Sequence, residues 1–215
     1  EKSNDAQPAS TAYDLVATEE QINRKYCGSS VCKFLFPFSI REQESRARLQ
    51  VPGLIIMAQQ TNRVLVLPNV GDARLGSCKS FTFDYYYSVE SMRQSAPNTT
   101  FITQDHFLQW NQEMKAIKAK KYTTKIVELS NAVGKEYIGS NQLDLKRYRK
   151  KECLLPFDHL EYETNATLDL HIARKTGDQF VIDALQSVQS DVILIRYTAY
   201  KFNYSLLKYQ PASLT

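Results

Sequence analysis

Two apolar runs decide the fold of this chain: Cys32-Lys-Phe-Leu-Phe-Pro-Phe38 and Arg63-Val-Leu-Val-Leu-Pro68. Both runs are short and rich in aromatic or aliphatic side chains, as is typical of strands buried in a parallel sheet. Residues 40–61 between them are polar at first and apolar later, which predicts a helix whose N-terminus reaches solvent. Pro52 and Gly53 predict a kink or a break in this helix. A strand, a crossover helix and a strand in this length form a parallel βαβ unit.

The later part of the chain repeats this alternation of apolar runs and amphipathic segments. We expect strands at residues 99–103, 125–129 and 191–196, and helices at residues 105–118 and 178–189. Alternation this regular predicts an α/β fold with a Rossmann-like, doubly wound and mostly parallel sheet.

The ends of the predicted domain follow from a change in composition. Residues 1–26 are polar and rich in Ser, Ala, Asn and Gln, so we interpret them as a stem or leader. Residues 27–215 then form the domain, and they are numerous enough to bury a sizeable core.

The charge of the chain argues against nucleic acid as a partner. It has 27 basic and 23 acidic side chains, a net charge of +4, which is too balanced for a continuous positive field. The basic tracts at residues 115–121 and 146–151 are interpreted as solvated helix faces. No apolar run approaches the ~18 to 20 residues that span a bilayer. We therefore expect membrane attachment only through an anchor upstream of Glu1.

The cysteines and the glycosylation sequons point to an oxidising compartment. An even number of cysteines allows two disulfides in three connectivities, which the sequence does not rank. Their spacing does not repeat the paired knuckles of a structural zinc site. Three N-x-Ser/Thr sequons add to this interpretation. We expect the lumen of the secretory pathway (ER or Golgi) or secretion. The residues concerned are Cys27, Cys32, Cys78 and Cys153, and Asn98, Asn165 and Asn203.

Candidate binding residues follow the first two strands. In an open parallel sheet, ligands bind beyond the carboxyl ends of the strands. After the first strand, Arg41 and Arg46 lie near an expected helix N-terminus and offer donors suited to phosphate. After the second, Asn69, Asp72 and Arg74 place an amide, a carboxylate and a guanidinium beside the same crevice. A solvated helix face and an ordinary turn are the alternatives for these two segments.

Other catalytic motifs are missing from the sequence. It contains no Walker loop, no G-x-G-x-x-G and no G-x-S-x-G, which disfavours P-loop nucleotidases, dinucleotide dehydrogenases and serine hydrolases. The three histidines stand in unrelated contexts and are interpreted as structural or exposed. The tyrosines at 85 to 87 follow Phe81 and Phe83. Such a cluster either stacks on a sugar ring or forms part of the core.

Two stretches carry a resemblance to a known family: Phe34-Leu-Phe-Pro-Phe-Ser-Ile-Arg-Glu-Gln-Glu-Ser-Arg-Ala47 and Ala58-Gln-Gln-Thr-Asn-Arg-Val-Leu-Val-Leu-Pro-Asn69. They resemble the N-terminal lobe of fungal O-fucosyltransferase-like proteins, and the likeness extends over about residues 32–200. Gln43 matches a glutamine of that family's cleft loop, whereas Glu42 stands where the family has asparagine. The second stretch follows the family pattern closely and is interpreted as packing rather than chemistry.

The resemblance implies a glycosyltransferase of GT-B type, with two facing Rossmann-like lobes. Such an enzyme transfers fucose from GDP-fucose to a hydroxyl of a protein or glycan, and the resemblance implies no metal. The family's second-lobe motif His-x-Arg does not occur in these 215 residues, so we expect an N-terminal lobe without its partner lobe, inactive by itself. The alternative is a secreted, non-catalytic carbohydrate- or protein-binding module. The implied donor-binding residues are Arg41, Gln43, Arg46, Asn69 and Arg74, and the carboxylates nearest the acceptor are Glu42 and Asp72.

Overall fold

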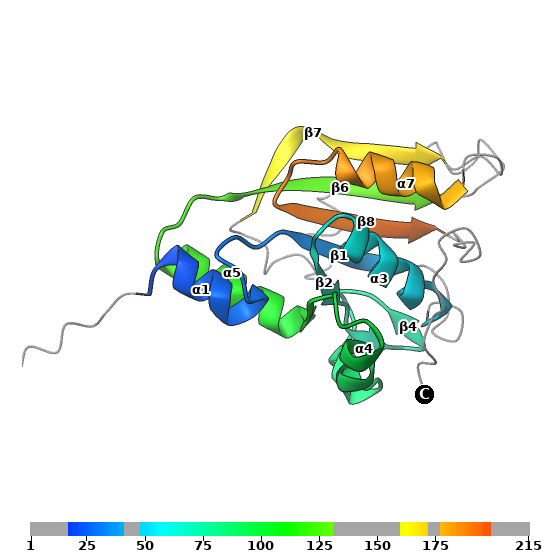
Figure 1. Ribbon diagram of the computed structural model, residues 1–215, viewed down its shortest axis with the longest axis horizontal. Helices are drawn as coiled ribbons and strands as arrows, with labels where there is room; N and C mark the ends of the chain where they lie inside the picture. The colour runs from blue at the N-terminus through cyan, green and yellow to red at the C-terminus, as the bar shows by residue number, and fades with distance from the viewer. Residues whose placement is uncertain (1–16, 41–47, 131–159, 172–176, 199–215) are drawn as a thin grey trace, which may run out of the picture.

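A parallel sheet forms the centre of the molecule. The structure is a computed structural model that describes residues 17–40, 48–130, 160–171 and 177–198. The described residues contain a six-stranded sheet with the order β5-β2-β1-β8-β6-β7, and all of its strand pairs are parallel. The arrows of β6, β7 and β8 point the same way in Figure 1. The strands are β1 (Phe34–Ile40), β2 (Val64–Leu67), β5 (Phe101–Thr103), β6 (Tyr122–Ser130), β7 (Leu160–His171) and β8 (Val192–Thr198).

The direction in which strands are added to the sheet reverses at β1. The chain builds outward from β1 to β2 and β5, crosses to β6 and β7, and returns to insert β8 between β1 and β6. The register of β1 and β8 shifts between Pro37 and Ser39. Proline has no N–H for the ladder, so a register shift is a usual place for it inside a sheet. This order confirms the predicted α/β, Rossmann-like, doubly wound fold.

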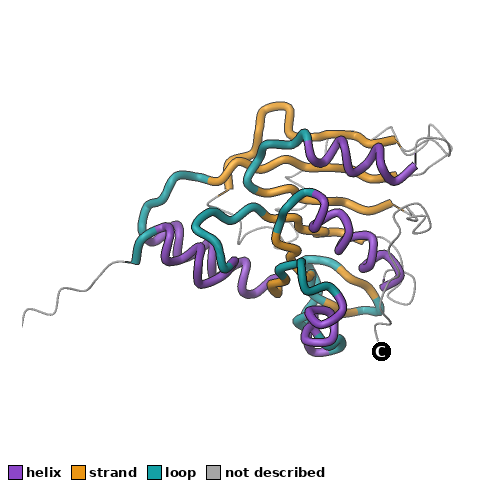
Figure 2. The backbone as a smooth tube through the Cα atoms, viewed as in Figure 1, coloured by secondary structure: helices purple, strands orange, loops and turns teal. Residues whose placement is uncertain are grey.

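Helices cover both faces of the sheet and create two apolar clusters. On one face, α3 (Val51–Gln60) and α7 (Gly177–Gln186) pack on Leu35 and Leu65. On the other, α1 (Glu19–Cys27) and α5 (Gln104–Ala116) pack on alternate residues, including Phe34. Neighbouring residues of a strand point to opposite faces, so each strand of the centre contributes to both clusters. Figure 2 shows these helices flanking the strands.

Of the helix predicted at residues 40–61, residues 41–47 lie outside the described residues, and the kink or break predicted at Pro52 and Gly53 falls where α3 begins. Strand β1 continues to Ile40, and the 3-10 turn η1 (Arg48–Gln50) leads into α3 at Val51. Pro52 therefore lies in the first turn of α3, where its missing N–H has no partner to lose. Pro52 starts this helix rather than interrupting it.

Part of the segment interpreted as a leader is folded. Helix α1 starts with a capping box, in which the Thr18 hydroxyl and the Gln21 side chain each accept a backbone hydrogen bond from the other residue. It ends at Gly28, whose φ of 69° is the left-handed conformation that glycine adopts without strain. The helix packs beside α5.

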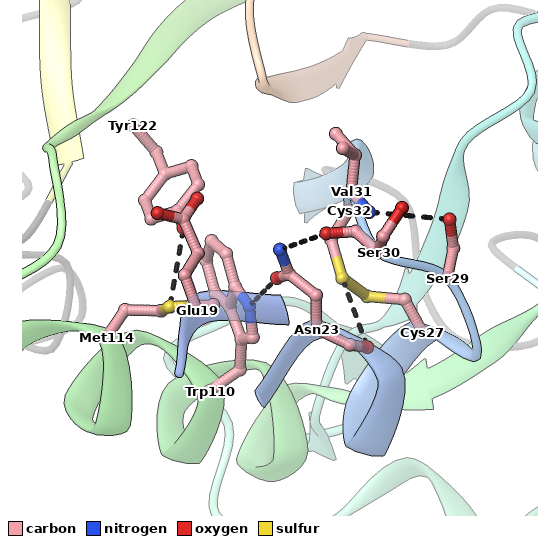
Figure 3. The surroundings of a disulfide bond; sticks show 10 residues. All are labelled: Glu19, Asn23, Cys27, Ser29, Ser30, Val31, Cys32, Trp110, Met114 and Tyr122. Carbon is pink, nitrogen blue, oxygen red and sulfur yellow. Dashed lines mark hydrogen bonds between the residues drawn. A yellow bond between two sulfur atoms is a disulfide. The ribbon is translucent and has the colours of Figure 1, made fainter. Parts of the chain in front are cut away.

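A buried asparagine and a disulfide fix the end of α1. The Asn23 amide oxygen accepts from Trp110 Nε1 at 2.9 Å, and its nitrogen donates to the Ser30 carbonyl at 2.9 Å. Cys27 and Cys32 form a disulfide across the turn that follows the helix. Figure 3 shows these groups around the sulfur atoms. Each buried polar atom of Asn23 therefore has a partner, and the turn is closed covalently.

The remaining predicted modification sites are distributed along the chain. Cys78 is also disulfide-bonded, whereas Cys153 and Asn203 lie outside the described residues. Asn98 is exposed before β5. Asn165 lies in β7, between Tyr162 and Thr167, where the pairing with β6 skips several residues. Within the described ranges, no helix has the length and apolarity needed to cross a membrane.

Candidate ligand-binding edge of the sheet

A short β-hairpin with a two-residue turn lies beyond β2, at the carboxyl edge of the sheet. Strand β3 (Val70–Gly71) pairs antiparallel with β4 (Arg74–Leu75), and Asp72 and Ala73 connect them. Their φ angles are 49° and 52°, so both connecting residues are left-handed, as in a type I′ turn. Asp is common in such turns because its short polar side chain tolerates the left-handed conformation. Ala is uncommon there, because its Cβ crowds the backbone.

The base of the hairpin is bonded to two strands of the large sheet. The Ser77 backbone N–H donates to the Phe38 carbonyl of β1 at 2.9 Å. Gln104, the first residue of α5 and directly after β5, is buried. Its oxygen accepts from the Asn69 N–H at 3.2 Å, and its nitrogen donates to the Ser77 carbonyl at 2.9 Å. The buried Gln104 amide therefore holds both ends of the hairpin segment beside the carboxyl end of β5, and the Ser77 N–H joins the segment to β1.

The side chains of the hairpin segment differ in how firmly they are held. Asn69 donates from Nδ2 to the Lys79 carbonyl at 3.1 Å, while its Oδ1 is buried without a hydrogen-bond partner among the described residues. A buried acceptor without a donor costs about 1 to 3 kcal/mol. The Asp72 side chain is 89% exposed and lies 3.1 Å from Lys79 Nζ. Arg74 is exposed.

The structure brings together only some of the residues that the sequence predicted for the site. Asn69, Asp72 and Arg74 lie on one hairpin segment at the carboxyl edge, as their position after β2 predicted. Arg41, Glu42, Gln43 and Arg46 lie outside the described residues. Their segment begins directly after Ile40, the last residue of β1.

A group of exposed aromatic rings lies beside this hairpin, and we call Phe81, Tyr85 and Tyr86 the aromatic platform. The side chains are 42%, 68% and 55% exposed, respectively. The Phe81 and Tyr85 rings stack with centroids 5.0 Å apart at an interplanar angle of 24°. The Tyr86 ring meets them edge-on, at 5.9 Å from Phe81 and 5.0 Å from Tyr85. The sequence indicates the cluster but does not decide whether its rings are core or surface.

A cavity of about 300 Å³ lies between the hairpin and the side chains of Tyr86 and Tyr87. Tyr86 contributes to both the platform and the cavity. The residues that line the cavity are Val70, Gly71, Asp72, Ala73, Tyr86 and Tyr87. The carboxylate of Asp72 and the phenols of Tyr86 and Tyr87 are the side-chain polar groups among these residues.

Comparisons with known proteins give a likeness in structure. No protein-family model matches the chain, and no curated protein matches it in sequence. The chain is similar in structure to the apo form of POFUT1, with a TM-score of 0.42 and 11% identity over 76% of this chain and 45% of that one. The complex of POFUT1 with GDP-fucose gives a TM-score of 0.39 and 13% identity over 75% and 44%. The chain thus spans less than half the length of either solved chain.

The opposite edge of the sheet contains a buried cation with a structural role. Arg63 precedes β2 and is 6% exposed. Its guanidinium donates to the carbonyls of Val188 at 2.8 Å, Asp191 at 3.2 Å and Phe34 at 3.4 Å. Burial lowers the pKa of Arg63 to about 10, and the nearby Asp191 charge opposes this shift. Arg63 joins the beginnings of three strands and lies away from the hairpin.

Proposed function

We propose that the chain is an N-terminal, Rossmann-like lobe of a GT-B glycosyltransferase of the O-fucosyltransferase type. The donor in this proposal is GDP-fucose, and the acceptor is a hydroxyl of a protein or glycan. The observation that supports it is the reversal of strand order at β1, because ligands of open α/β sheets bind outside the carboxyl ends of the strands where the strand order reverses. The segment that follows β1 there, residues 41–47, belongs to the stretch that resembles the transferase family.

The proposed roles follow from the chemistry of the donor. Arg41 and Arg46 bind the diphosphate, since planar guanidinium groups form paired hydrogen bonds with phosphate oxygens. Gln43, Asn69 and Arg74 complete the donor contacts. The carboxylates nearest the acceptor are those of Glu42 and Asp72.

Catalysis in this proposal is electrostatic. Cationic donors stabilise the charge that develops on the departing diphosphate, and contacts that strengthen in the transition state accelerate the transfer. A second lobe with its own phosphate-binding arginine completes the site, and the roles proposed for this lobe require no metal.

The proposed location is the lumen of the secretory pathway or the exterior of the cell. Disulfides persist in those compartments and are uncommon in reducing ones. The Cys27–Cys32 bond, the bonded Cys78 and the exposed sequon at Asn98 support this location.

Calorimetric titration with GDP and GDP-fucose tests the donor site. Arg41→Ala and Arg46→Ala should each weaken GDP binding roughly tenfold or more, because each removes a hydrogen bond between charged groups. Arg24→Ala is the matched control, since Arg24 is 61% exposed on α1 and pairs with Glu20. Equal affinity in all four proteins, wild type included, would remove residues 41–46 from the donor site.

The second candidate function is a non-catalytic carbohydrate- or protein-binding module. The exposed aromatic platform favours it, because soluble domains seldom expose three contacting rings without a partner. A transferase releases GDP from GDP-fucose when acceptor is present, whereas a module leaves the donor intact. Chromatography of the nucleotide after incubation with the protein, its second lobe and the acceptor distinguishes the two.

A further inference from the structure

We propose that the aromatic platform and the cavity beside it bind one pyranose ring of a glycan. A pyranose has a flat apolar face of C–H groups and a rim of hydroxyls. The rings of the platform are partly exposed to solvent, and the hairpin adds the carboxylate of Asp72 beside Tyr86. Aromatic residues with a polar end suit ligands that are apolar on one side and hydrated on the other.

The platform is held in place by bonds that do not depend on a ligand. The Phe81 N–H donates to the Val70 carbonyl at 3.0 Å, and the Val70 N–H donates to the Phe81 carbonyl at 2.7 Å. Phe83, in the 3-10 turn η2 (Phe83–Tyr85), is 1% exposed and anchors the following rings through Tyr87, with centroids 4.7 Å apart. Binding to a surface that is already ordered avoids the free energy of ordering it.

The size of the cavity matches a single ring. Its volume of about 300 Å³ is at the lower end of the ~300 to 1,000 Å³ range of small-molecule sites. Residues 70–73 form its hairpin wall, and Tyr86 and Tyr87 provide the opposite wall. The hydroxyls of a sugar in this space would find the exposed carboxylate of Asp72 as an acceptor.

The same geometry disfavours two other kinds of ligand. A cage for a quaternary ammonium group surrounds the cation with rings, whereas Phe81 and Tyr85 stack directly on each other and leave no space between them for a cation. A phosphate group would meet the Asp72 carboxylate, and the nearby Lys79 ammonium already pairs with it at 3.1 Å. A neutral ring with hydroxyls remains as the ligand class that fits.

The location of the platform gives this sugar a role in the proposed transfer reaction, and this step rests on the proposed function. The hairpin is bonded through Ser77 to Phe38 of β1, so the cavity adjoins the edge where the donor is proposed to bind. The ring on the platform then belongs to the acceptor, which makes the acceptor a glycan rather than a bare protein hydroxyl.

Saturation-transfer NMR with mannotriose, chitotriose and cellotriose tests the platform. We expect at least one trisaccharide to receive saturation at its ring C–H protons. Tyr86→Ala should weaken its affinity about fivefold or more, and Tyr86→Phe should retain most of it, because the ring face makes the contact. Phe81→Ala should also weaken binding. Phe180→Ala is the matched control, because Phe180 on α7 is likewise 42% exposed.

Several results would overturn the proposal. The first is that none of the trisaccharides receives saturation from the protein. The second is that saturation transfer is unchanged in Phe81→Ala and Tyr86→Ala. The third is that GDP, choline or a proline-rich peptide displaces the sugar. Calorimetry with GDP separates this proposal from the proposed function. Loss of sugar binding in Tyr86→Ala with normal GDP affinity supports the platform, and sugar binding without any GDP binding supports the platform while contradicting the donor site.

Discussion

At the scale of single residues, the hairpin tip has a conformation that its sequence does not favour. Ala73 has a φ of 52°, where its Cβ crowds the backbone at an energy of about 1 kcal/mol. We expect Ala73→Gly to raise the free energy of unfolding by about 0.5 kcal/mol, because glycine relieves this strain but has a more flexible unfolded chain. Urea denaturation measures the change.

A control variant separates local strain from a general effect of glycine. Ala184→Gly makes the same substitution within helix α7, where glycine lowers stability by about 0.5 to 1 kcal/mol. A loss of stability in Ala73→Gly as large as in Ala184→Gly would contradict the left-handed conformation of Ala73.

Arg63 is a buried charged residue whose removal should disturb the fold. From a buried position, its guanidinium donates to one carbonyl at the start of β1 and to two carbonyls that precede β8. We expect Arg63→Ala to lower the free energy of unfolding by about 2 to 4 kcal/mol, through an unpaired carbonyl and a cavity. Arg63→Lys should recover only part of this lost stability, because an ammonium group donates to fewer of these carbonyls than a guanidinium does. Thermal or urea unfolding checks the order, and a neutral Arg63→Ala would contradict the structural role.

At the scale of elements, the Glu113 carboxylate joins α5 to α1 by hydrogen bonds. Glu113 of α5 accepts from Lys25 Nζ at 2.6 Å and from the Tyr26 hydroxyl at 2.8 Å. Burial raises the pKa of Glu113, but the bonds from Lys25 and Tyr26 outweigh it, and the pKa ends below the ordinary 4.5. A carboxylate with a lowered pKa stabilises the folded state above its unfolded pKa, and the effect disappears as the pH falls through the folded pKa.

Glu113→Gln should therefore destabilise the protein slightly at pH 7 and not at all at low pH. The loss is much smaller than for Arg63→Ala, because the side chains of Glu113 and Lys25 are 37% and 59% exposed. The urea midpoints of the wild type and Glu113→Gln, measured from pH 7 to below pH 4.5, should become equal as the pH falls. A difference that stays constant across this range would assign the effect to packing rather than charge.

Elements with a continuous apolar run could be predicted from the sequence. The strands expected at 125–129 and 191–196 lie within β6 and nearly coincide with β8, and the helix expected at 105–118 matches α5 within two residues. These elements are buried in the middle of the sheet or on its face, so their patterns are strong.

Elements at the margins of the fold could not be predicted in the same way. Strand β7 is an edge strand in which polar residues interrupt the apolar ones, with the sequence Leu-Glu-Tyr-Glu-Thr-Asn-Ala-Thr-Leu-Asp-Leu-His. Helix α1 has a mostly polar sequence, and its position depends on packing of Ile22 and Asn23 against the domain. Tertiary contacts, rather than local preference, decide such segments.

At the scale of the whole molecule, stability should be greatest in the centre of the sheet. Strands β1 and β8 are each paired on both sides, whereas within the described part of the chain β7 is paired only with β6. Amides that open only on global unfolding exchange most slowly. We expect hydrogen exchange followed by mass spectrometry to find the slowest amides in β1 and β8 and faster ones in β7. Equal protection in β7 would indicate that another chain pairs with this edge.

The candidate site is only partly predictable, for a reason that concerns the whole fold. The alternation of strands and helices along the sequence is enough to place Asn69, Asp72 and Arg74 at the carboxyl edge. Whether Tyr85 and Tyr86 face the core or solvent depends on the burial of Phe83 and on the bridge between Val70 and Phe81. Such contacts between distant residues leave no local pattern.

The position of β8 also affects how this protein is made. Its residues are among the last of the described chain to leave the ribosome, yet they fill the gap between β1 and β6, with Phe34 pairing Val192. Until they arrive, two apolar strands each have an unpaired edge, which readily pairs with other chains. Synthesis that stops short of β8 therefore releases a substrate for chaperones and proteases rather than a smaller folded domain.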